Sequence, residues 1–522
     1  MASLNILANR ILDWCEKSPD LDVLTFVSIG DKGEILDDVR SYQQLWDNGQ
    51  RLAKWLRGQG IGKGDSFAIV MANHAEFVEL MVASSILGSI FVPIDPRTKG
   101  DKLQYMLEFA ECKGVIAAEY ALDNVIRASK EKPERWILPL SGQASSVQNI
   151  LAGPKVAPEL TVASTDEDEP MQLLFTSGTT GDPKAILTAH SRFGATLAIA
   201  DILGLTDQDR PYTGLSLTHA NAQIITLGCT LALGLRGVIS RKFKKSNLWQ
   251  IARKYGCTWF NLLGGMTTAV YSEPANIDDA DNPVRIILSA GMPEMLWENF
   301  EQRFSVTICE FYGAAEGGLT INPVGVGPRG SCGKPTPNLK LTILNEDDEE
   351  CAIGDAGEIC FQNSDGSVPL IKYFKNPSAS QEKMQGGYLR MGDIGHVDDQ
   401  GWLFFHHRMG GGIRRNGDFI NTGFVEKALG KIDGVDDVYV YGVPLKGMAP
   451  GEKEVVAAIV KNSEYELSVS DIFTTCKESL DKGAMPGYLQ FVDEIPKTAS
   501  EKPQERFLLE SFDVHAANVY AN

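Results

Sequence analysis

The sequence predicts an α/β protein with a large N-terminal domain of mainly parallel, helix-flanked sheets plus a small β-barrel, followed by a smaller mobile α+β domain. Three features lead to this prediction. Apolar, strand-like segments alternate with helical segments over most of the chain. Short strands separated by turn residues follow from residue 327. The glycine- and arginine-rich segment HHRMGGGIRRNGDFI then precedes a C-terminal part of mixed helix and strand character.

The alternation of strands and helices begins near residue 66. The predicted strands are SFAIVM (66–71), SIFVPID (89–95) and 115–118, and the predicted helices between them are 74–87 and 101–112. The pattern continues with helices at 247–255 and 295–304 and strands at 258–263, 285–290 and 306–312. Such alternation favours parallel strands covered by helices on both faces, and ligands then bind at the strand ends.

Changes in composition indicate the domain boundaries. The turn sequences NEDDEE and GDAGE separate short strands, so a small β-barrel or distorted sheet is expected at about 327–405. Three glycines at 410–412 mark a point where the chain can swivel, because glycine adopts backbone angles that strain other residues. A hairpin turn is the alternative. We therefore expect an N-terminal domain at 1–408 and a mobile C-terminal domain at 409–522.

Composition and charge narrow the classes of function. The chain has 522 residues, a formal net charge of −19 and 43% hydrophobic residues, which is typical of a globular protein. An acidic chain of this kind lacks the basic face of a nucleic-acid binder. Its nine cysteines are scattered without a Cys-x-x-Cys pair, which favours free thiols in a reducing compartment. Without a recognisable secretory signal or a stretch long enough to span a bilayer, a cytoplasmic protein with no membrane span is expected.

The segment TSGTTGDPK (176–184) is the strongest candidate for a binding motif. It follows the strand-like MQLLF (171–175), and its glycines allow main-chain N–H groups to converge on an anion while hydroxyls and a lysine add donors and charge. A Walker-type phosphate loop is disfavoured because Gly181 and Lys184 have the wrong spacing and no hydroxyl follows the lysine. A polar turn before a helix is the alternative for this segment taken alone.

TSGTTGDPK resembles the phosphate-binding signature of the adenylate-forming superfamily, which includes acyl-CoA and aryl-CoA synthetases, peptide-synthetase adenylation domains and luciferases. Further motifs similar to those of the superfamily follow in order: FYGAAEGG (311–318), GEICFQ (357–362), GYLRMGD (387–393), HHRMGGGIRRNGDFI (406–420) and PKTASEKPQERF (496–507). The resemblance spans residues 20–510 approximately. In FNLLGGM (260–266) and THANAQ (218–223) the chain is most similar to carnitine/crotonobetaine-type and related acyl-CoA ligases.

The resemblance implies that the chain uses ATP and Mg²⁺ to join a carboxylic acid to AMP and then transfers the acyl group to coenzyme A. The catalytic residues that it implies are Lys502, which would bridge the α-phosphate and the substrate carboxylate, Glu316 and His219. Glu316 and Thr176 are the implied magnesium ligands. The implied nucleotide-binding residues are Thr176, Ser177, Gly178, Thr179, Thr180, Gly181, Lys184, Ala290, Gly291, Met292, Pro293, Tyr312, Gly313, Ala314, Ala315, Asp393 and Arg408. Arg414 and Gly417 would contact coenzyme A.

The acyl pocket follows from the same resemblance. Its expected residues are Asn221, Gln223, Phe260, Gly264, Gly265 and Met266. Many relatives carry a Pro-Thr pair where this chain has two glycines, and missing side chains enlarge a cavity. We therefore expect a medium-sized or bulky carboxylic acid as the substrate. The expected partners are this acid, ATP and coenzyme A, with no nucleic acid, and the chain is expected to be a monomer or a homodimer.

Elementary electrostatics explains why such a site needs positive charge more than a general base. A carboxylate with a pKa of about 4 is already ionised at neutral pH. It must approach a triphosphate, and like charges about 4 Å apart repel by about 4 kcal/mol at an effective dielectric constant of about 20. We therefore expect catalysis by charge neutralisation and alignment.

Several residues have a plainer alternative explanation or depart from the superfamily pattern. An isolated charged residue is usually a solvated surface group, and a lone loop histidine such as His219 is often structural. Ala315 replaces a threonine, Gly410 stands where an Asp or Lys is usual, and Glu501 replaces the glycine before Lys502. Two alternative functions therefore stay open: an acyl-AMP ligase that loads a carrier protein, and a nucleotide-binding homologue without catalytic activity.

Overall fold

The computed structural model describes residues 2–176, 183–263, 265–409, 413–415, 418–420, 422–446, 448, 453–480, 483–498, 501 and 503–522, of which Arg414, Asp418, Phe419 and Phe424 are described by their backbone alone. The chain forms two compact units. The first contains residues 1–261, 282–287 and 371–382, and the second contains residues 262–281, 288–370 and 383–522. The predicted boundary between residues 408 and 409 stays a prediction.

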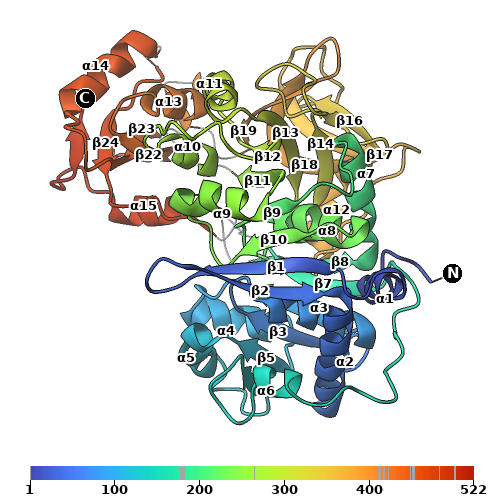
Figure 1. The fold of residues 1–522 in the computed structure, drawn as a ribbon. Coiled ribbons are helices and arrows are strands. Elements are labelled where there is room, and N and C mark those ends of the chain that lie inside the picture. Colours follow the sequence, from blue (N-terminus) through green and yellow to red (C-terminus); the bar gives the residue numbers. More distant parts are fainter. Residues whose placement is uncertain are drawn as a thin grey trace. The chain divides into compact units, whose positions relative to one another are not determined.

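The first unit contains a six-stranded sheet in the order β6-β5-β3-β4-β7-β8 (Figure 1). Its strands are β3 (Ser66–Val70), β4 (Ile90–Ile94), β5 (Gly114–Ala117), β6 (Trp136–Pro139), β7 (Pro170–Phe175) and β8 (Ala185–Ala189). All neighbours are parallel except β7 and β8. The structure thus confirms the predicted βαβ pattern, and the direction of chain progression reverses at β3, where ligands bind in open α/β sheets.

Helices cover both faces of this sheet. The helices are α1 (Leu7–Lys17), α2 (Tyr42–Gly58), α3 (Ala75–Leu87), α4 (Gly100–Phe109), α5 (Glu119–Ala128) and α6 (Val147–Leu151). Alternate strand residues such as Ala68 and Val70 pack in one cluster with Leu107 of α4 and Val125 of α5. On the other side α3 packs against α2 and α1 (Figure 1). Right-handed crossovers place the helices in this way, because β4 lies on one side of β3 and β5 on the other.

A second group of strands in the first unit has the order β2-β1-β10-β9, with the first residues of β11 beside β9. These strands are β1 (Asp22–Ile29), β2 (Ile35–Ser41), β9 (Pro211–Thr213), β10 (Gly237–Ser240) and β11 (Trp259–Leu263). The accompanying helices are α7 (Ala195–Ile202), a π-helix (Ala222–Leu227), α8 (Gly228–Leu233) and α9 (Leu248–Tyr255), with 3₁₀ turns at His190–Gly194 and Lys245–Asn247. Strands β11 and β12 (Ile286–Ala290) contribute residues to both units.

The second unit begins with an antiparallel arrangement of β13 (Thr307–Ala314), β14 (Gly317–Ile321) and β15 (Lys334–Pro335), together with α10 (Met266–Tyr271) and α11 (Glu294–Phe304). A four-stranded antiparallel sheet follows, formed by β16 (Leu339–Leu344), β17 (Gly357–Asn363), β18 (Leu389–Val397) and β19 (Leu403–Arg408). Helix α12 (Pro377–Lys383), whose residues 377–382 belong to the first unit, and a 3₁₀ turn (Gln385–Gly387) precede β18 in the chain. The strand order in this sheet is β16-β17-β18-β19. The sheet lies in the region for which the sequence predicted a small β-barrel or a distorted sheet.

The C-terminal part is the predicted α+β module. Its sheet has the order β22-β23-β24-β25, after a hairpin of β20 (Ile413–Arg415) and β21 (Asp418–Ile420). The remaining elements are α13 (Thr422–Leu429), β22 (Val435–Val443), β23 (Glu454–Lys461), α14 (Val469–Ser479), β24 (Tyr488–Phe491), α15 (Glu505–Ser511) and β25 (Val519–Ala521). Val440 packs in one cluster with α13 and α14, and the next residue, Tyr441, packs in another with α15. This alternation gives the module a core on each face of its sheet.

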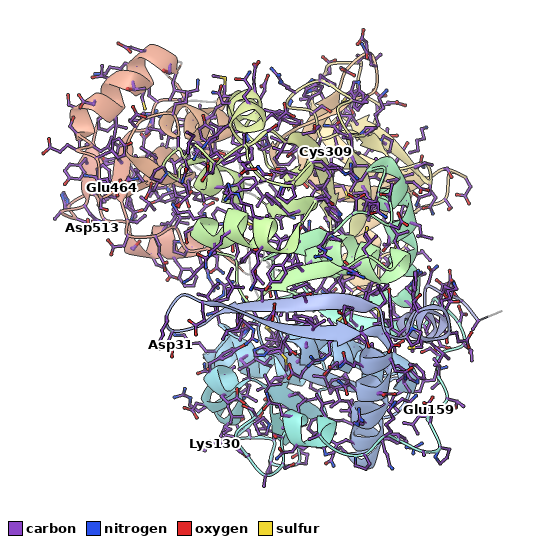
Figure 2. All side chains as sticks on the ribbon, in the orientation of Figure 1. Asp31, Lys130, Glu159, Cys309, Glu464 and Asp513 are labelled. Carbon is purple, nitrogen blue, oxygen red and sulfur yellow. The ribbon has the colours of Figure 1, made fainter. Side chains whose placement is uncertain are left out.

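The cysteines and the acidic side chains differ in how far they are exposed to solvent. None of the nine cysteines, all of which the structure describes, forms a disulfide, and most of them, including Cys309, are buried. Asp31, Glu159, Glu464 and Asp513 are exposed, as expected for a chain of net charge −19 (Figure 2). None of the helices in the described ranges combines the length and apolar character that crossing a bilayer requires.

Candidate functional site

The predicted phosphate loop connects two antiparallel strands, β7 and β8. At its base Thr176 N donates to Lys184 O at 2.8 Å. Lys184 is exposed, and its Nζ lies 5.6 Å from the centre of the Tyr373 ring. A strand follows the loop, which is inconsistent both with a Walker-type loop and with a turn before a helix. The remaining predicted phosphate-binding residues, whose roles stay predictions, lie outside the described residues: Ser177, Gly178, Thr179, Thr180 and Gly181.

Asp393 is a buried carboxylate within a small polar group of the second unit. It lies on β18, and its partner across the ladder is Arg408 on β19. The Tyr312 hydroxyl donates to Asp393 Oδ2 at 2.6 Å, and Arg408 Nε lies 3.6 Å from Asp393 Oδ1. Burial, and then the charge of Asp393, raise the pKa of Tyr312 well above its ordinary value, so the phenol keeps its proton. The structure therefore brings together three residues that the sequence assigned to nucleoside binding.

The loop Ala290–Pro293, predicted to contact the nucleotide, is held by Glu310. The backbone N–H groups of Gly291 and Met292 both donate to the Glu310 carboxylate, with Met292 N 3.1 Å from Oε1. Gly291 has a φ of 104°, in the region that favours glycine. Burial raises the pKa of Glu310 to about 7, although the two N–H groups oppose this shift. A buried carboxyl on β13 thus fixes the conformation of this loop.

Glu316 lies at the tip of the β13–β14 hairpin, where Ala314 pairs with Gly317. Gly313 has no room for a side chain, since a Cβ there would lie 2.9 Å from the Gly318 carbonyl oxygen. Glu316 and Ala315 are partly exposed at the turn. Within the described ranges, no three His, Cys, Asp or Glu residues form a group that could hold a metal ion. A single carboxylate nevertheless fits Mg²⁺ that arrives with a nucleotide, because the ion then takes most of its ligands from phosphates and water.

His219 lies on the loop after β9, and Asn73 bonds to the backbone of this loop. Asn73 is 1% exposed and follows β3. Its Nδ2 donates to Leu215 O and Ser240 O, and its Oδ1 accepts from Leu217 N, all at 2.8 Å. These bonds tie the loop after β9, which contains the half-buried His219, to the ends of β3 and β10.

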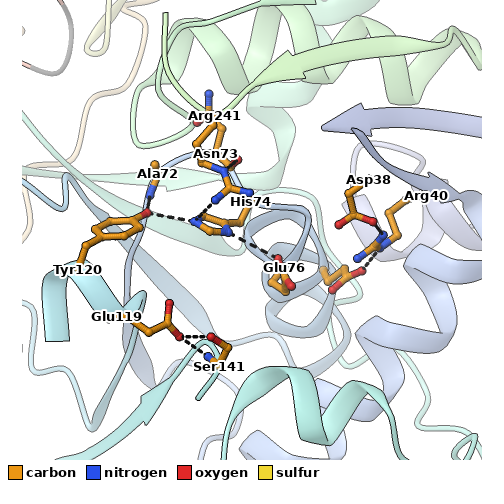
Figure 3. Close-up of polar contacts among 11 residues, drawn as sticks. Asp38, Arg40, Ala72, Asn73, His74, Glu76, Glu119, Tyr120, Ser141 and Arg241 are labelled. Carbon is orange, nitrogen blue, oxygen red and sulfur yellow. Dashed lines mark hydrogen bonds and ion pairs between the residues drawn. The ribbon is translucent and has the colours of Figure 1, made fainter. Parts of the chain in front are cut away.

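Arg241 bonds to Asn73 and to His74, and neither His74 nor Arg241 changes its charge near neutral pH (Figure 3). Arg241 Nη1 donates to His74 Nε2 at 2.9 Å, and Arg241 Nε donates to Asn73 O at 2.9 Å. The Tyr120 hydroxyl lies 3.1 Å from His74 Nε2. Arginine can only donate, so His74 is the acceptor and its imidazole is neutral. Burial, and then the Arg241 charge, lower the pKa of His74 to about 3, which keeps these contacts unchanged at neutral pH.

Asn221 and Gln223 lie at the start of the π-helix that continues into α8. Asn261 Nδ2 on β11 donates to Asn221 Oδ1, and the Thr226 hydroxyl donates to Asn261 Oδ1 at 3.0 Å. Gln223 Nε2 donates to Leu217 O at 2.7 Å. Within the part of the chain that the structure describes, Asn221 Nδ2 and Gln223 Oε1 are buried without a hydrogen-bond partner.

Phe260 lies on the opposite face of β11 from Asn261, because side chains alternate along a strand. Its ring packs edge-on against Tyr212 and Trp249, with centroid distances of 6.2 and 5.6 Å. Phe260 is thus surrounded by aromatic core residues, and its predicted contact with the acid stays a prediction.

Gly265 adjoins an ion pair in the second unit. Lys497 Nζ contacts the Asp437 carboxylate, and a Cβ on Gly265 would lie 2.9 Å from Lys497 Nζ. Met266, buried, begins α10. The missing side chain at Gly265 therefore makes room for Lys497. Gly264 lies outside the described residues, so the combined effect of the two glycines stays a prediction.

The described residues of the terminal lysine motif make backbone contacts with one another. Lys497 pairs with Pro503, and Glu501 N donates to Thr498 O at 3.0 Å. Glu501 has a φ of 58°, a left-handed conformation that glycine adopts without strain and that costs a larger residue about 1–2 kcal/mol. Lys502, Gly417 and the side chain of Arg414 lie outside the described part, so their roles stay predictions.

Four polar residues of the site were not predicted by name, although Asn261 lies within the predicted pocket segment 260–266. They are Asn73, Thr226, Asn261 and Glu310. Asn73, Asn261 and Glu310 share one signal, which is a polar residue within or directly after an apolar strand, as in SFAIVMAN, WFNLL and TICEFYGA. Such a residue must find a partner when buried. The sequence does not reveal which partner, because the contacts join segments far apart in the chain.

Comparison with protein families gives two matches. The model of a family described as AMP-binding enzyme matches residues 12–366, and the model described as AMP-binding enzyme C-terminal domain matches residues 425–502.

Individual relatives extend over nearly the whole chain. The medium/long-chain-fatty-acid–CoA ligase FadD17 of Mycobacterium marinum is 26% identical over 496 residues, covering 93% of this chain and 94% of that protein. The crotonobetaine/carnitine–CoA ligase of Salmonella heidelberg is 25% identical over 480 residues, covering 88% and 91%. The crystal structure of the anthranilate CoA ligase AuaEII with anthranoyl-AMP has the same fold, with a TM-score of 0.83 at 22% identity and coverage of 97% and 96%.

Replacement of Asn73 by alanine is expected to lower stability and loosen the loop that contains His219. The change leaves two carbonyls and one N–H group buried without partners, and each costs about 1–3 kcal/mol. A thermal scan should show a melting temperature lower by several degrees, and amide exchange in residues 214–220 should accelerate. Asn149→Ala is the control, because exposed Asn149 also donates to two carbonyls. Equal effects of the two substitutions would contradict the role assigned to Asn73.

Replacement of Glu310 by glutamine is expected to change how stability depends on pH. The pKa of Glu310 is raised from 4.5 to about 7 in the folded state, so its contribution to stability is fully present below pH 4.5 and is lost as pH rises through 7. The melting temperature of the wild type relative to Glu310→Gln should therefore fall between these pH values and then level off. A difference that stays constant from pH 4 to pH 8 would contradict this assignment.

Proposed function

Because the chain belongs to the AMP-binding enzyme family and is an ATP-dependent, AMP-forming acyl-CoA ligase, we propose that it activates a medium-sized or bulky carboxylic acid. The observation that best supports a nucleotide site among the predicted residues is the group of Tyr312, Asp393 and Arg408. The proposed size of the acid rests on Gly264 and Gly265, which lack side chains in the segment after β11, with Lys497 Nζ in the space beside Gly265.

In the first step an oxygen of the substrate carboxylate attacks the α-phosphorus of ATP, and the bond from that phosphorus to pyrophosphate breaks. Lys502 contacts both the α-phosphate and the carboxylate, so one positive charge offsets the repulsion between the two reactants. The loop 176–184 holds the β- and γ-phosphates with main-chain N–H groups, hydroxyls and Lys184. Glu316 and Thr176 would hold Mg²⁺, which would supply further charge neutralisation at the phosphates.

The nucleoside is held by groups whose protonation is fixed. Asp393 accepts hydrogen bonds from the ribose hydroxyls while Tyr312, which keeps its proton, orients the carboxylate and lies against the adenine. Arg408 adds a donor on the other side of the ribose. Glu310 keeps the backbone of Gly291 and Met292 in place beside the base.

In the second step the thiol of coenzyme A attacks the acyl carbonyl, the bond to AMP breaks, and the thiol proton is lost to solvent. A thiol with a pKa near 8.5 attacks a mixed anhydride readily, so positioning matters more than a strong base. Gly417 lines the pantetheine path, and Arg414 contacts a phosphate of coenzyme A. The C-terminal domain, residues 409–522, rotates about the triple glycine to bring this segment into place.

The state of the cysteines supports a cytoplasmic location. The free thiols of all nine cysteines are the form expected in the reducing cytoplasm. The partners are small molecules, and the enzyme is a monomer or a homodimer.

Lys502→Ala is expected to reduce the rate of acyl-AMP formation by at least about a hundredfold, because the variant lacks the charge that bridges the two anions. Carboxylate-dependent exchange of labelled pyrophosphate into ATP measures this step alone. Lys502→Arg, which keeps the charge, should retain more activity, and Lys477→Ala, at an exposed position of α14, should match the wild type. Full exchange activity in Lys502→Ala would refute the mechanism.

A panel of carboxylic acids tests the substrate class and the acceptor together. Pyrophosphate release is measured for each acid, with and without coenzyme A. Acids of six or more carbons, including alicyclic ones, are expected to react faster than acetate, and AMP and acyl-CoA should accumulate only when coenzyme A is present. Acetate as the fastest substrate would contradict the proposed pocket size, and turnover that stops at acyl-AMP would point to a carrier-protein acceptor.

A further inference from the structure

A chain of hydrogen bonds runs through the first unit beside the segments assigned to the acyl pocket. Thr226 donates to Asn261 Oδ1 at 3.0 Å, and Asn261 Nδ2 donates to Asn221 Oδ1. The three side chains are 0%, 2% and 8% exposed, respectively. They come from two elements, the π-helix with its first flanking residue and strand β11. The hydrogen bonds between these three buried side chains therefore run in one direction, from the donor Thr226 through Asn261 to Asn221.

The π-helix accounts for this grouping. In an α-helix residues three or four apart lie on one face, whereas the wider turn of a π-helix, with i→i+5 hydrogen bonds, brings residues five apart onto a shared face. Asn221 and Thr226 are five apart, and both bond to the same amide of Asn261. π-Helical turns are rare and occur frequently at functional sites. The local winding of the helix thus serves to align these two side chains.

The direction of the chain is set by Thr226. A hydroxyl needs an acceptor for its proton, and within the described ranges Asn261 Oδ1 is the acceptor that Thr226 reaches. This contact orients the Asn261 amide so that its Nδ2 faces Asn221, which in turn presents its Oδ1. The Asn221 Nδ2 group is then left at the end of the chain, buried and without a partner among the described residues.

From this arrangement we infer that the enzyme selects an acid whose chain carries a hydrogen-bond-accepting oxygen, an oxo or hydroxy acid, and that Asn221 Nδ2 donates to this oxygen. The inference rests on the proposed function, which places Asn221 in the acyl pocket. A buried amide left without an acceptor is costly, so an oxygen at this point is favoured over a methylene group. A protonated amine at the same point is disfavoured because it would bring two donors together.

The test compares acids that differ at one position within one enzyme. The probes are octanoate, the oxo- and hydroxyoctanoates that carry the oxygen at different positions, and the corresponding aminooctanoates. Pyrophosphate exchange is measured for each. For the best isomer, kcat/KM is expected to exceed that of octanoate by at least about tenfold, with the amino analogue below octanoate. Asn221→Leu, similar in volume, should bring the ratio of oxygenated acid to octanoate close to one.

Threonine variants separate this role from a general effect on stability. Thr226→Val removes the hydroxyl that orients the chain and should lower the same ratio several-fold. Thr230→Val is the matched control, since this buried hydroxyl of the next turn donates to Thr226 O and touches neither amide. Its ratio should equal that of the wild type.

The outcomes distinguish this inference from the proposed function. If no acid supports exchange, the proposed function fails. If acids support exchange but octanoate matches or exceeds every oxygenated isomer, or if Asn221→Leu leaves the ratio unchanged, the inference fails and the proposed function stands.

Discussion

Asn73 makes the hydrogen bonds on which the arrangement of the first unit depends. The chain after β3 supplies Asn73, whose side chain bonds to two backbone groups of the loop after β9, Leu215 O and Leu217 N, and to Ser240 O at the end of β10. A buried backbone group without a partner costs about as much as a lost hydrogen bond. One carboxamide satisfies two carbonyls and one N–H group, which few other side chains have the donors and acceptors to do. The loop that contains His219 can therefore lie inside the protein, in one conformation.

The groups that hold the site in shape are mostly neutral. Asn73 and the imidazole of His74 carry no charge at neutral pH, and the buried Glu310 has its pKa raised to about 7. Burying an unpaired charge is expensive, so structural polar groups in the interior are better neutral. In contrast, Lys184 is exposed and Arg408 is half-exposed. In the proposed mechanism these charges stay hydrated until a nucleotide displaces the water, and the repulsion between the substrate anions is then met by charges that did not have to be buried during folding.

Much of the fold follows from local patterns. The strand and helix alternation between residues 66 and 118 matches β3, α3, β4, α4 and β5 closely, because apolar runs bounded by turns leave few alternatives. The family was identified from motif order and is confirmed by the two family matches. The contacts of Glu310 and Asn261 were not predicted, since they join residues from separate strands and loops. Phe260 illustrates the same limit: the pocket segment was recognised, but alternation along β11 places this ring among Tyr212 and Trp249.

The two ends of the acid impose different demands on the protein. Every substrate presents the same carboxylate to the same phosphate, so charge neutralisation at that end accelerates the reaction of all acids alike and cannot distinguish among them. Discrimination must come from contacts with the rest of the acid. In a wholly apolar pocket, each extra methylene group changes the preference by only about 1–3 kcal/mol. A buried amide whose own neighbours fix its orientation discriminates more strongly, because an acid that lacks the matching oxygen leaves that amide unpaired. The Thr226–Asn261–Asn221 chain fixes the orientation of its amides within the protein, which is what the inferred contact with the acid requires.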